Sequence, residues 1–179
     1  DDVSAGTPPT KFVRLVLALC VSKPPKQGKT KRTRQISRAD VRVAFFHASI
    51  GDAKIAVNPK PGDLPITDDQ KAALDQALYG TQKASLLWGE QVGRVLIREG
   101  YKRGAVSGQL SWHPSWDVSG GVRGDGFLFE GEPECLNLHE DVLLRNFDTK
   151  ILARLGPGGD PRGDFLSREI TWTERGFGW

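Results

Sequence analysis

The chain has 179 residues and a mass of 19.6 kDa, which suits one domain with a hydrophobic core. Charged residues make up 26% of the sequence and hydrophobic residues 38%, and this balance excludes a disordered polypeptide. The net charge of +3 and the isoelectric point of about 9.0 permit a polyanionic partner without requiring one. With 21 glycines and 11 prolines the chain is rich in turns, which favours an α+β fold over a helical bundle.

Membrane spans, disulfides and zinc sites are not expected. The longest apolar run, Leu15 to Val21, is too short to cross a bilayer, and no signal peptide is visible. We therefore expect an intracellular protein of unassigned compartment. Cys20 and Cys135 lie in apolar surroundings typical of free core thiols, and no zinc-ligand spacing joins them to the histidines. The chain holds no methionine, even at position 1, so we expect a processed piece, a fragment or an incompletely determined sequence.

The N-terminal part begins with an apolar helix and continues into a basic segment. Lys11 to Val21 is apolar nearly all round, which predicts a buried helix with Thr10 as its N-cap. Residues 23–38 carry basic side chains and no acid, which predicts a basic loop. This loop is either a solvated insertion or an arm that contacts nucleic-acid phosphates. For the second alternative, the candidate contacts are Lys26, Lys29, Lys31, Arg32 and Arg34.

Short strands and a possible helix start follow the basic segment. Asp40 to Phe46 is typical of a strand that runs into a turn or a helix start, and Ile55 to Val57 of a short strand. Thr67 and Gln70 form a capping-box pattern, which predicts a helix leading to Leu78.

Two stronger helices and several strands complete the pattern. Ala84 to Glu99 is amphipathic and ends at Gly100, with Trp88 expected as a core anchor, and Pro133 to Asn146 is a second amphipathic helix. Strands are predicted over Tyr101–Trp112, Trp116–Phe129, Ile151–Leu155 and Phe165–Trp172, with a final hairpin beginning at Thr173. This order predicts an α+β fold, an antiparallel sheet backed by helices on one face. We divide it into a helix and basic loop over 1–38 and a main domain over 39–179.

The Gly124-Asp125-Gly126 turn, called here the acid turn, is the feature around which the sheet is predicted to form. Glycine adopts the positive φ angles that a tight hairpin turn requires, so Asp125 is expected at a hairpin tip. Asp40 begins another predicted strand, and two acids at neighbouring strand ends can share a divalent cation. Taken alone, an aspartate in a glycine turn is more often only a turn residue.

Four short motifs follow one another along the chain. They are Asp40-Val41-x-x-Ala44-Phe45-x-His47-Ala48; Leu78-Tyr79-Gly80-Thr81 with Ala84 and Trp88; Arg123-Gly124-Asp125-Gly126-Phe127; and Arg154-Leu155-Gly156-Pro157-Gly158 with Phe165-Leu166-Ser167-Arg168-Glu169-Ile170-Thr171-Trp172. In this order they resemble the reverse transcriptase of copia-type retrotransposons, especially the divergent copies in polyproteins of some unicellular algae. The resemblance extends from about Thr7 to Trp179 and implies a reverse-transcriptase palm.

The resemblance implies metal-assisted nucleotidyl transfer, in which Mg²⁺ is held by carboxylates. The matching acids are Asp40 and Asp125. Phe45 would lie beneath the sugar of the incoming nucleotide, and Phe165 to Trp172 would hold the primer end. The residues that would back the nucleotide and template include Tyr79, Gly80, Gln82 and Lys83.

The sequence departs from the family pattern at this site. Gly126 stands where the family has a third acid, which removes one ligand and one negative charge. We expect this loss to raise the barrier by several kcal/mol and to slow the reaction about a thousandfold or more. Gln82 replaces the family's basic residue, and Arg123 places a cation beside the acid turn. The sequence shows no counterpart of the family's fingers strands, thumb or RNase H domain.

Three functions stay open on the sequence alone. The first is a palm-like retrotransposon fragment that has lost catalysis and still binds nucleic acid or protein. The second is an accessory structural subunit of a larger protein assembly. The third is a residually active RNA-directed DNA polymerase that requires Mg²⁺. Because of Gly126 and the missing domains, we expect the first two over the third.

Overall fold

The structure, a computed structural model, describes residues 9–24, 33–49, 56–58, 60, 65, 67, 70–77, 84–105 and 107–179. Within them the α-helices are α1 (Pro9–Ser22), α2 (Ala84–Arg98) and α3 (Pro133–Asn146), and a 3₁₀ helix spans Ala44–His47. The strands are β1 (Gln35–Val41), β2 (Ala56–Val57), β3 (Ala72–Ala73), β4 (Lys102–Arg103), β5 (Leu110–His113), β6 (Val118–Arg123), β7 (Gly126–Gly131), β8 (Thr149–Leu155), β9 (Arg162–Phe165), β10 (Arg168–Thr173) and β11 (Gly176–Gly178).

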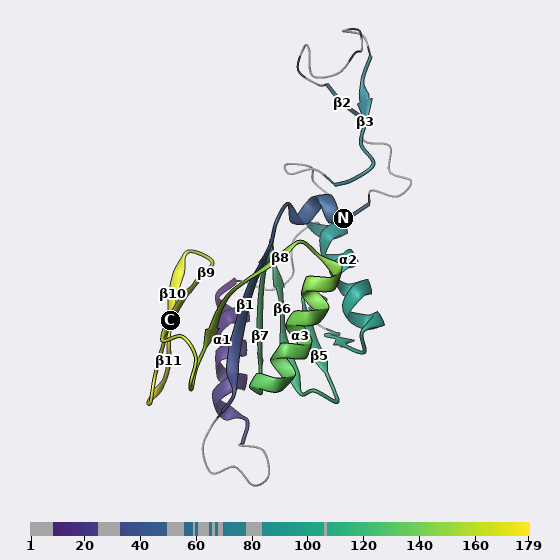
Figure 1. Cartoon of the computed structure of the whole chain (residues 1–179). Helices are drawn as coiled ribbons and strands as arrows, with labels where there is room; N and C mark the ends of the chain where they lie inside the picture. The colour runs from purple at the N-terminus through teal and green to yellow at the C-terminus, as the bar shows by residue number, and fades with distance from the viewer. Residues whose placement is uncertain are drawn as a thin grey trace.

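A six-stranded antiparallel sheet in the order β4-β5-β6-β7-β1-β8 forms the centre of the molecule. Strands β9, β10 and β11 form a separate three-stranded antiparallel sheet, drawn yellow in Figure 1. Strands β2 and β3 pair in a small sheet that projects away from the others (Figure 1). The fold is therefore α+β with antiparallel sheets, as the sequence predicts.

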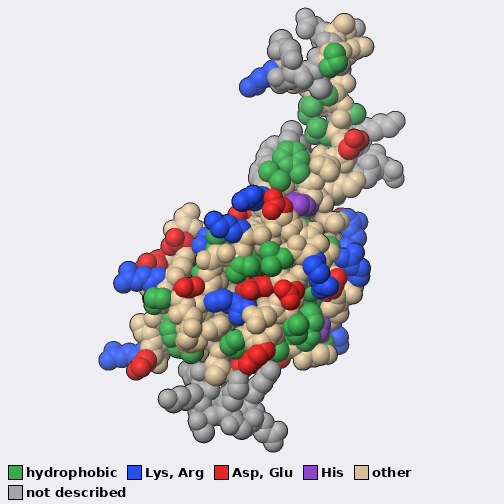
Figure 2. All heavy atoms as spheres, viewed as in Figure 1, with side chains coloured by type: hydrophobic (Ala, Val, Ile, Leu, Met, Phe, Trp, Pro, Cys, Tyr) green, Lys and Arg blue, Asp and Glu red, His purple; other side chains and the backbone are tan. Residues whose placement is uncertain are grey.

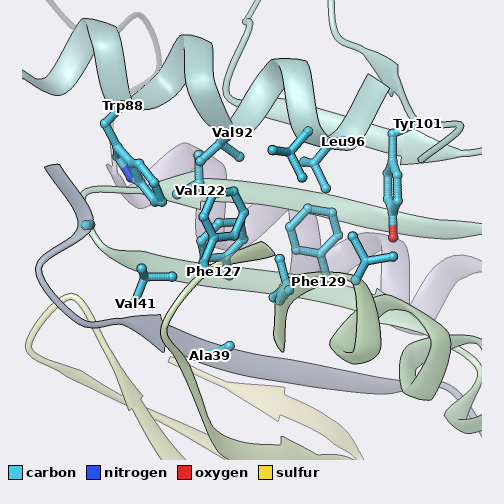
Figure 3. Packing of buried hydrophobic residues seen from close by; sticks show 14 of the residues in the cluster. Ala39, Val41, Trp88, Val92, Leu96, Tyr101, Val122, Phe127 and Phe129 are labelled. Carbon is cyan, nitrogen blue, oxygen red and sulfur yellow. The ribbon is translucent and has the colours of Figure 1, made fainter. Parts of the chain in front are cut away.

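A hydrophobic core lies on each face of the central sheet, and successive side chains of a strand point to opposite faces. On β7, Phe127 and Phe129 belong to the core beneath α2 and α3, whereas Leu128 belongs to the core beneath α1 and the β9–β11 sheet. Figure 3 shows Trp88, Val92 and Leu96 of α2 pointing toward the phenylalanines of β7. Helices α2 and α3 back one face, as predicted, but α1 (purple in Figure 1) packs on the other, so the prediction that helices lie on one face only is wrong.

The two amphipathic helices have the limits that their sequences predict. In α2 the buried residues recur at helical spacing, and Gly100 follows the helix with a φ of +94°, a value that glycine adopts without strain. Helix α3 begins with Pro133, whose missing N–H would have no partner in a first turn anyway. Local propensity and burial agree in both helices, which is why their bounds are predictable.

Two sequence predictions are corrected. Residues 35–38 are not loop, because β1 already begins at Gln35, so the division between residues 38 and 39 falls inside this strand.

The capping-box pattern is not followed by the predicted helix. The Thr67 N–H donates to Gln70 Oε1 over 3.0 Å, but the chain then enters β3 and pairs with β2. A local cap can form a turn without a helix behind it, because most helical stability comes from tertiary packing.

In the parts of the chain that the structure describes, no helix combines the length and the apolar character that crossing a bilayer requires. This agrees with the prediction that the sequence has no membrane span.

Candidate functional site at the acid turn

Asp40 and Asp125 meet at one end of the central sheet. Asp40 lies opposite Gly126 in the β1–β7 ladder, and the Val41 N–H donates to the Asp125 carbonyl oxygen over 3.0 Å. This main-chain bond ties the end of β1 to the acid turn. Asp40 on β1 and Asp125 in the turn between β6 and β7 therefore lie at adjacent positions, as predicted, and their joint binding of a metal stays a prediction.

The surroundings of Asp40 make its carboxyl group harder to ionise. The pKa of Asp40 is raised, first because the carboxyl group is partly buried and second because the negative charge of Asp125 lies nearby. The cation of Arg38, two residues earlier on β1, opposes this shift. Asp40 is half-buried and Asp125 is exposed, so water and dissolved cations can reach the site.

The donor set suits one divalent cation rather than two. Mg²⁺ prefers oxygen ligands in octahedral geometry and is often bound by one or two carboxylates, with water filling the other positions. Asp40 and Asp125 provide such a pair, and among the described residues no group of three or more His, Cys, Asp or Glu side chains could hold a metal ion. A two-metal site needs more donors than these two acids supply.

The acid turn is held in place by Trp88, whose role the sequence analysis missed. Its indole Nε1–H donates to the Gly124 carbonyl oxygen over 2.7 Å, and its side chain is only 2% exposed. The ring also packs edge-on against Phe127 and Phe147. A buried indole N–H usually has a hydrogen-bond partner, so a tryptophan expected in the core could have been expected to donate a hydrogen bond as well. Trp88 is thus both a core residue and a support for the backbone next to Asp125.

The chain leaves β1 through an unusual backbone conformation. Val43 has a φ of 45°, in the left-handed region that β-branched residues rarely adopt. The 3₁₀ helix follows, and Phe45 within it is half-buried against the core beneath α2. Its proposed contact with a nucleotide sugar stays a prediction. The other predicted nucleotide-binding residues, Tyr79, Gly80, Gln82 and Lys83, lie outside the described residues.

The prediction that Arg34 contacts nucleic acid is corrected. The side chain is 4% exposed, and its guanidinium donates through Nε and Nη2 to Glu130 Oε2 at 2.8 and 2.5 Å. Its Nη1 donates to Asp117 over 2.8 Å, and Lys23 Nζ reaches both acids, at 2.8 and 2.7 Å. These partners lie far away in the sequence, so the basic run alone could not reveal them. The remaining predicted contacts, Lys26, Lys29, Lys31 and Arg32, lie outside the described residues.

Charge on the visible face of the molecule is mixed. Figure 2 shows basic and acidic side chains interspersed over the face that carries α3, rather than separated into a basic and an acidic patch.

Comparison with protein-family models, with curated proteins and with solved structures finds no match to the chain. Its function must therefore be inferred from its own residues and their geometry.

Proposed function

We propose that the chain is a palm-like domain of the reverse-transcriptase type found in copia-type retrotransposons, with its polymerase activity lost. The observation that supports this most directly is the pairing of Asp40 with Asp125 at the sheet end. The motif resemblance requires this pairing. An aspartate that only forms a turn does not need a second acid from a distant strand beside it.

Two further features support the proposal. The hairpin of β6 and β7 carries the acid turn beside β1. Helices α2 and α3 pack against one face of the sheet that these strands form. Strands β9 and β10 form a hairpin where the resemblance expects a primer-contacting one. These features agree with the palm-like arrangement that the motifs imply.

The loss of activity follows from the donor count. Nucleotidyl transfer in this family uses two dications, which stabilise the attacking and leaving oxygens. Gly126 contributes no carboxylate, and the two acids that are present suit one cation. The chain is therefore expected to bind a single Mg²⁺ or Mn²⁺ weakly and to extend primers no faster than a variant without Asp40.

Primer extension and cation binding test this proposal together. Wild-type protein, Asp40→Asn and Asp125→Asn are incubated with a primed RNA template, deoxynucleotides and Mg²⁺ or Mn²⁺, and Mn²⁺ binding is followed by electron paramagnetic resonance. We expect one Mn²⁺ site that either substitution abolishes, and equal background extension in all three proteins. Asp141→Asn, on the exposed face of α3, is the matched control. Mn²⁺ binding that ignores both substitutions would count against the proposal.

Nucleic-acid binding by the inactive domain is tested by salt. Contacts to phosphates release counterions, so the affinity for a primed duplex should fall steeply as salt rises. Fluorescence anisotropy at several salt concentrations measures this slope. An affinity that does not change with salt would exclude the phosphate-contacting arm.

A role as a structural subunit is the second candidate, supported by apolar side chains on the outer surfaces of α2 and α3. Leu86 and Ile97 on α2 are 50% and 54% exposed, and Leu138 and Leu144 on α3 are 44% and 50% exposed. Large exposed apolar groups gathered on one side of a protein often mark a protein contact. Sedimentation of native material tests this role, since a subunit migrates with a large assembly and a free protein does not.

A further inference from the structure

The sheet face that carries α1 is wider than the elements that cover it. Six strands about 4.8 Å apart span about 24 Å, whereas a helix with its side chains is about 10–12 Å across. Helix α1 packs over β6, β7 and β1, and β9 packs beside β8. Among the described residues, these elements leave the end of the sheet formed by β4 and β5 exposed on this face.

A groove with apolar walls lies along this uncovered end, between α1 and strands β4 to β6. Its volume is about 230 Å³, and we call it the α1–β5 groove. Leu15 and Leu19 form its wall on α1, and Leu110 and Trp112 form its floor on β5. Leu15 is 41% exposed and Trp112 is 43% exposed, so an apolar group on the wall and one on the floor are open to a partner.

The charges at the groove are basic. Lys102 Nζ lies 5.8 Å from the centre of the Trp112 ring, on the groove side of β4. The guanidinium of Arg103 lies on the other face of the sheet, where it donates to the Gly108 carbonyl oxygen and to the Gly89 carbonyl oxygen of α2. The described residues that line the groove include no acid.

We propose that the α1–β5 groove binds an amphipathic helix of another protein, with apolar side chains on Trp112 and acidic side chains near Lys102. The uncovered width of about two strands, or 10 Å, matches the diameter of one helix. A groove of this kind fits an apolar stripe at helical spacing, and Lys102 at its edge favours acidic side chains on the bound helix. This inference does not depend on the reverse-transcriptase proposal.

A second copy of the chain is a poorer occupant. The exposed face of α3 carries Leu138 and Leu144 together with Glu134 and Asp141, so it has the required chemistry. However, α3 and the groove are different surfaces, so such a contact would be head-to-tail and would generate open chains unless it closed into a ring.

Peptide binding to the full chain tests the proposal. The probe is a capped, fluorescein-labelled helical peptide with leucines at i, i+3, i+4 and i+7 and glutamates on both flanks. Its matched control has lysines in place of the glutamates. By fluorescence anisotropy we expect one bound peptide per chain, about tenfold preference for the glutamate peptide, and loss of binding in Trp112→Ala. Lys102→Glu should reverse the preference, and Leu144→Ala on the outer face of α3 should change nothing.

Three results would overturn the proposal. The first is equal binding of the two peptides. The second is binding that survives both Trp112→Ala and Lys102→Glu. Circular dichroism establishes that each variant is folded. Lys102 is exposed on an edge strand, so its variant tests the groove even where Trp112→Ala fails to fold. The third is self-association of the wild type, measured by size-exclusion chromatography with light scattering, that Trp112→Ala abolishes, because the occupant would then be a second copy.

Discussion

Asp40 lies directly opposite Gly126 in the β1–β7 ladder, so the acid of β1 faces a residue without a side chain. A Cβ atom added at Gly126 would lie 3.0 Å from Cε2 of Phe165, a buried residue of β9. A third acid here would therefore have to share its space with the Phe165 ring. A change that added a carboxylate at position 126 would therefore also disturb the packing of the β9–β11 sheet.

Gly126→Asp should strengthen Mn²⁺ binding, because a third carboxylate would join Asp40 and Asp125. The close contact with Phe165 requires the ring to shift by a few tenths of an ångström, so stability should fall by about 1–3 kcal/mol. Isothermal titration calorimetry measures the affinity and urea denaturation the stability.

Gly126→Asn is the matched control for this substitution, because it has the same size without the charge. We expect Asn to lower stability as Asp does and to leave the Mn²⁺ affinity near that of the wild type. Equal affinities of the Asp and Asn variants would show that a carboxylate at this position does not reach the cation.

Trp88→Phe should weaken Mn²⁺ binding without altering either acid. The substitution removes the indole N–H that donates to the Gly124 carbonyl oxygen over 2.7 Å, and the unpaired carbonyl should cost about 1–3 kcal/mol of stability. The acid turn is then less firmly held, and the position of Asp125 becomes less well defined. Titration calorimetry and urea denaturation again provide the two measurements.

A second buried residue of α2 separates support of the turn from general stability. Val92→Ala creates a cavity and should also lower stability by a few kcal/mol. It touches no hydrogen bond of the acid turn, so its folded form should bind Mn²⁺ as the wild type does. If both variants lost affinity in proportion to stability, Trp88 would be only a core residue.

Local signals predicted the helices, and long-range contacts account for what was missed. Helix α3 was predictable from its amphipathic pattern and its N-terminal proline, both contained within the segment. The pairing of Asp40 with Asp125 joins distant segments, and motif resemblance supplied it. Arg34 was misassigned because its partners, Glu130 and Asp117, are 96 and 83 positions away. A basic run has the same sequence pattern whether its side chains face water or buried acids.

Arg34→Ala should destabilise the protein by about 3–5 kcal/mol, because it leaves the fully buried carboxylate of Glu130 without its main partner. Arg34→Lys keeps the charge but loses the forked donors, so it should cost less. Arg94→Ala, on the exposed side of α2, should change stability by less than about 1 kcal/mol. Urea denaturation compares the three. A loss below that of Arg94→Ala would mean that Arg34 is not a structural ion-pair residue.

His139 should make the protein less stable in mild acid. The side chain is 1% exposed, and its Nδ1 lies 2.7 Å from the Tyr101 hydroxyl oxygen. Burial is the main reason that its pKa falls from 6.5 to about 3, and the charge of Arg154 adds to the effect. Between these two values the unfolded chain binds a proton that the folded chain does not. The free energy of unfolding should therefore fall as the pH falls from 6.5 toward 3, by up to about 1.4 kcal/mol per pH unit from this group.

The contribution of His139 is isolated by comparing slopes. In His139→Gln the group no longer titrates, so the free energy of unfolding should depend less steeply on pH over this range than in the wild type. Tyr101→Phe keeps the histidine and removes the hydroxyl, so it should lower stability by about 1–2 kcal/mol at every pH while keeping the wild-type slope. Urea denaturation at several pH values measures all three. Equal slopes in the wild type and His139→Gln would show that the folded protein accepts a proton at His139, which contradicts its burial as a neutral side chain.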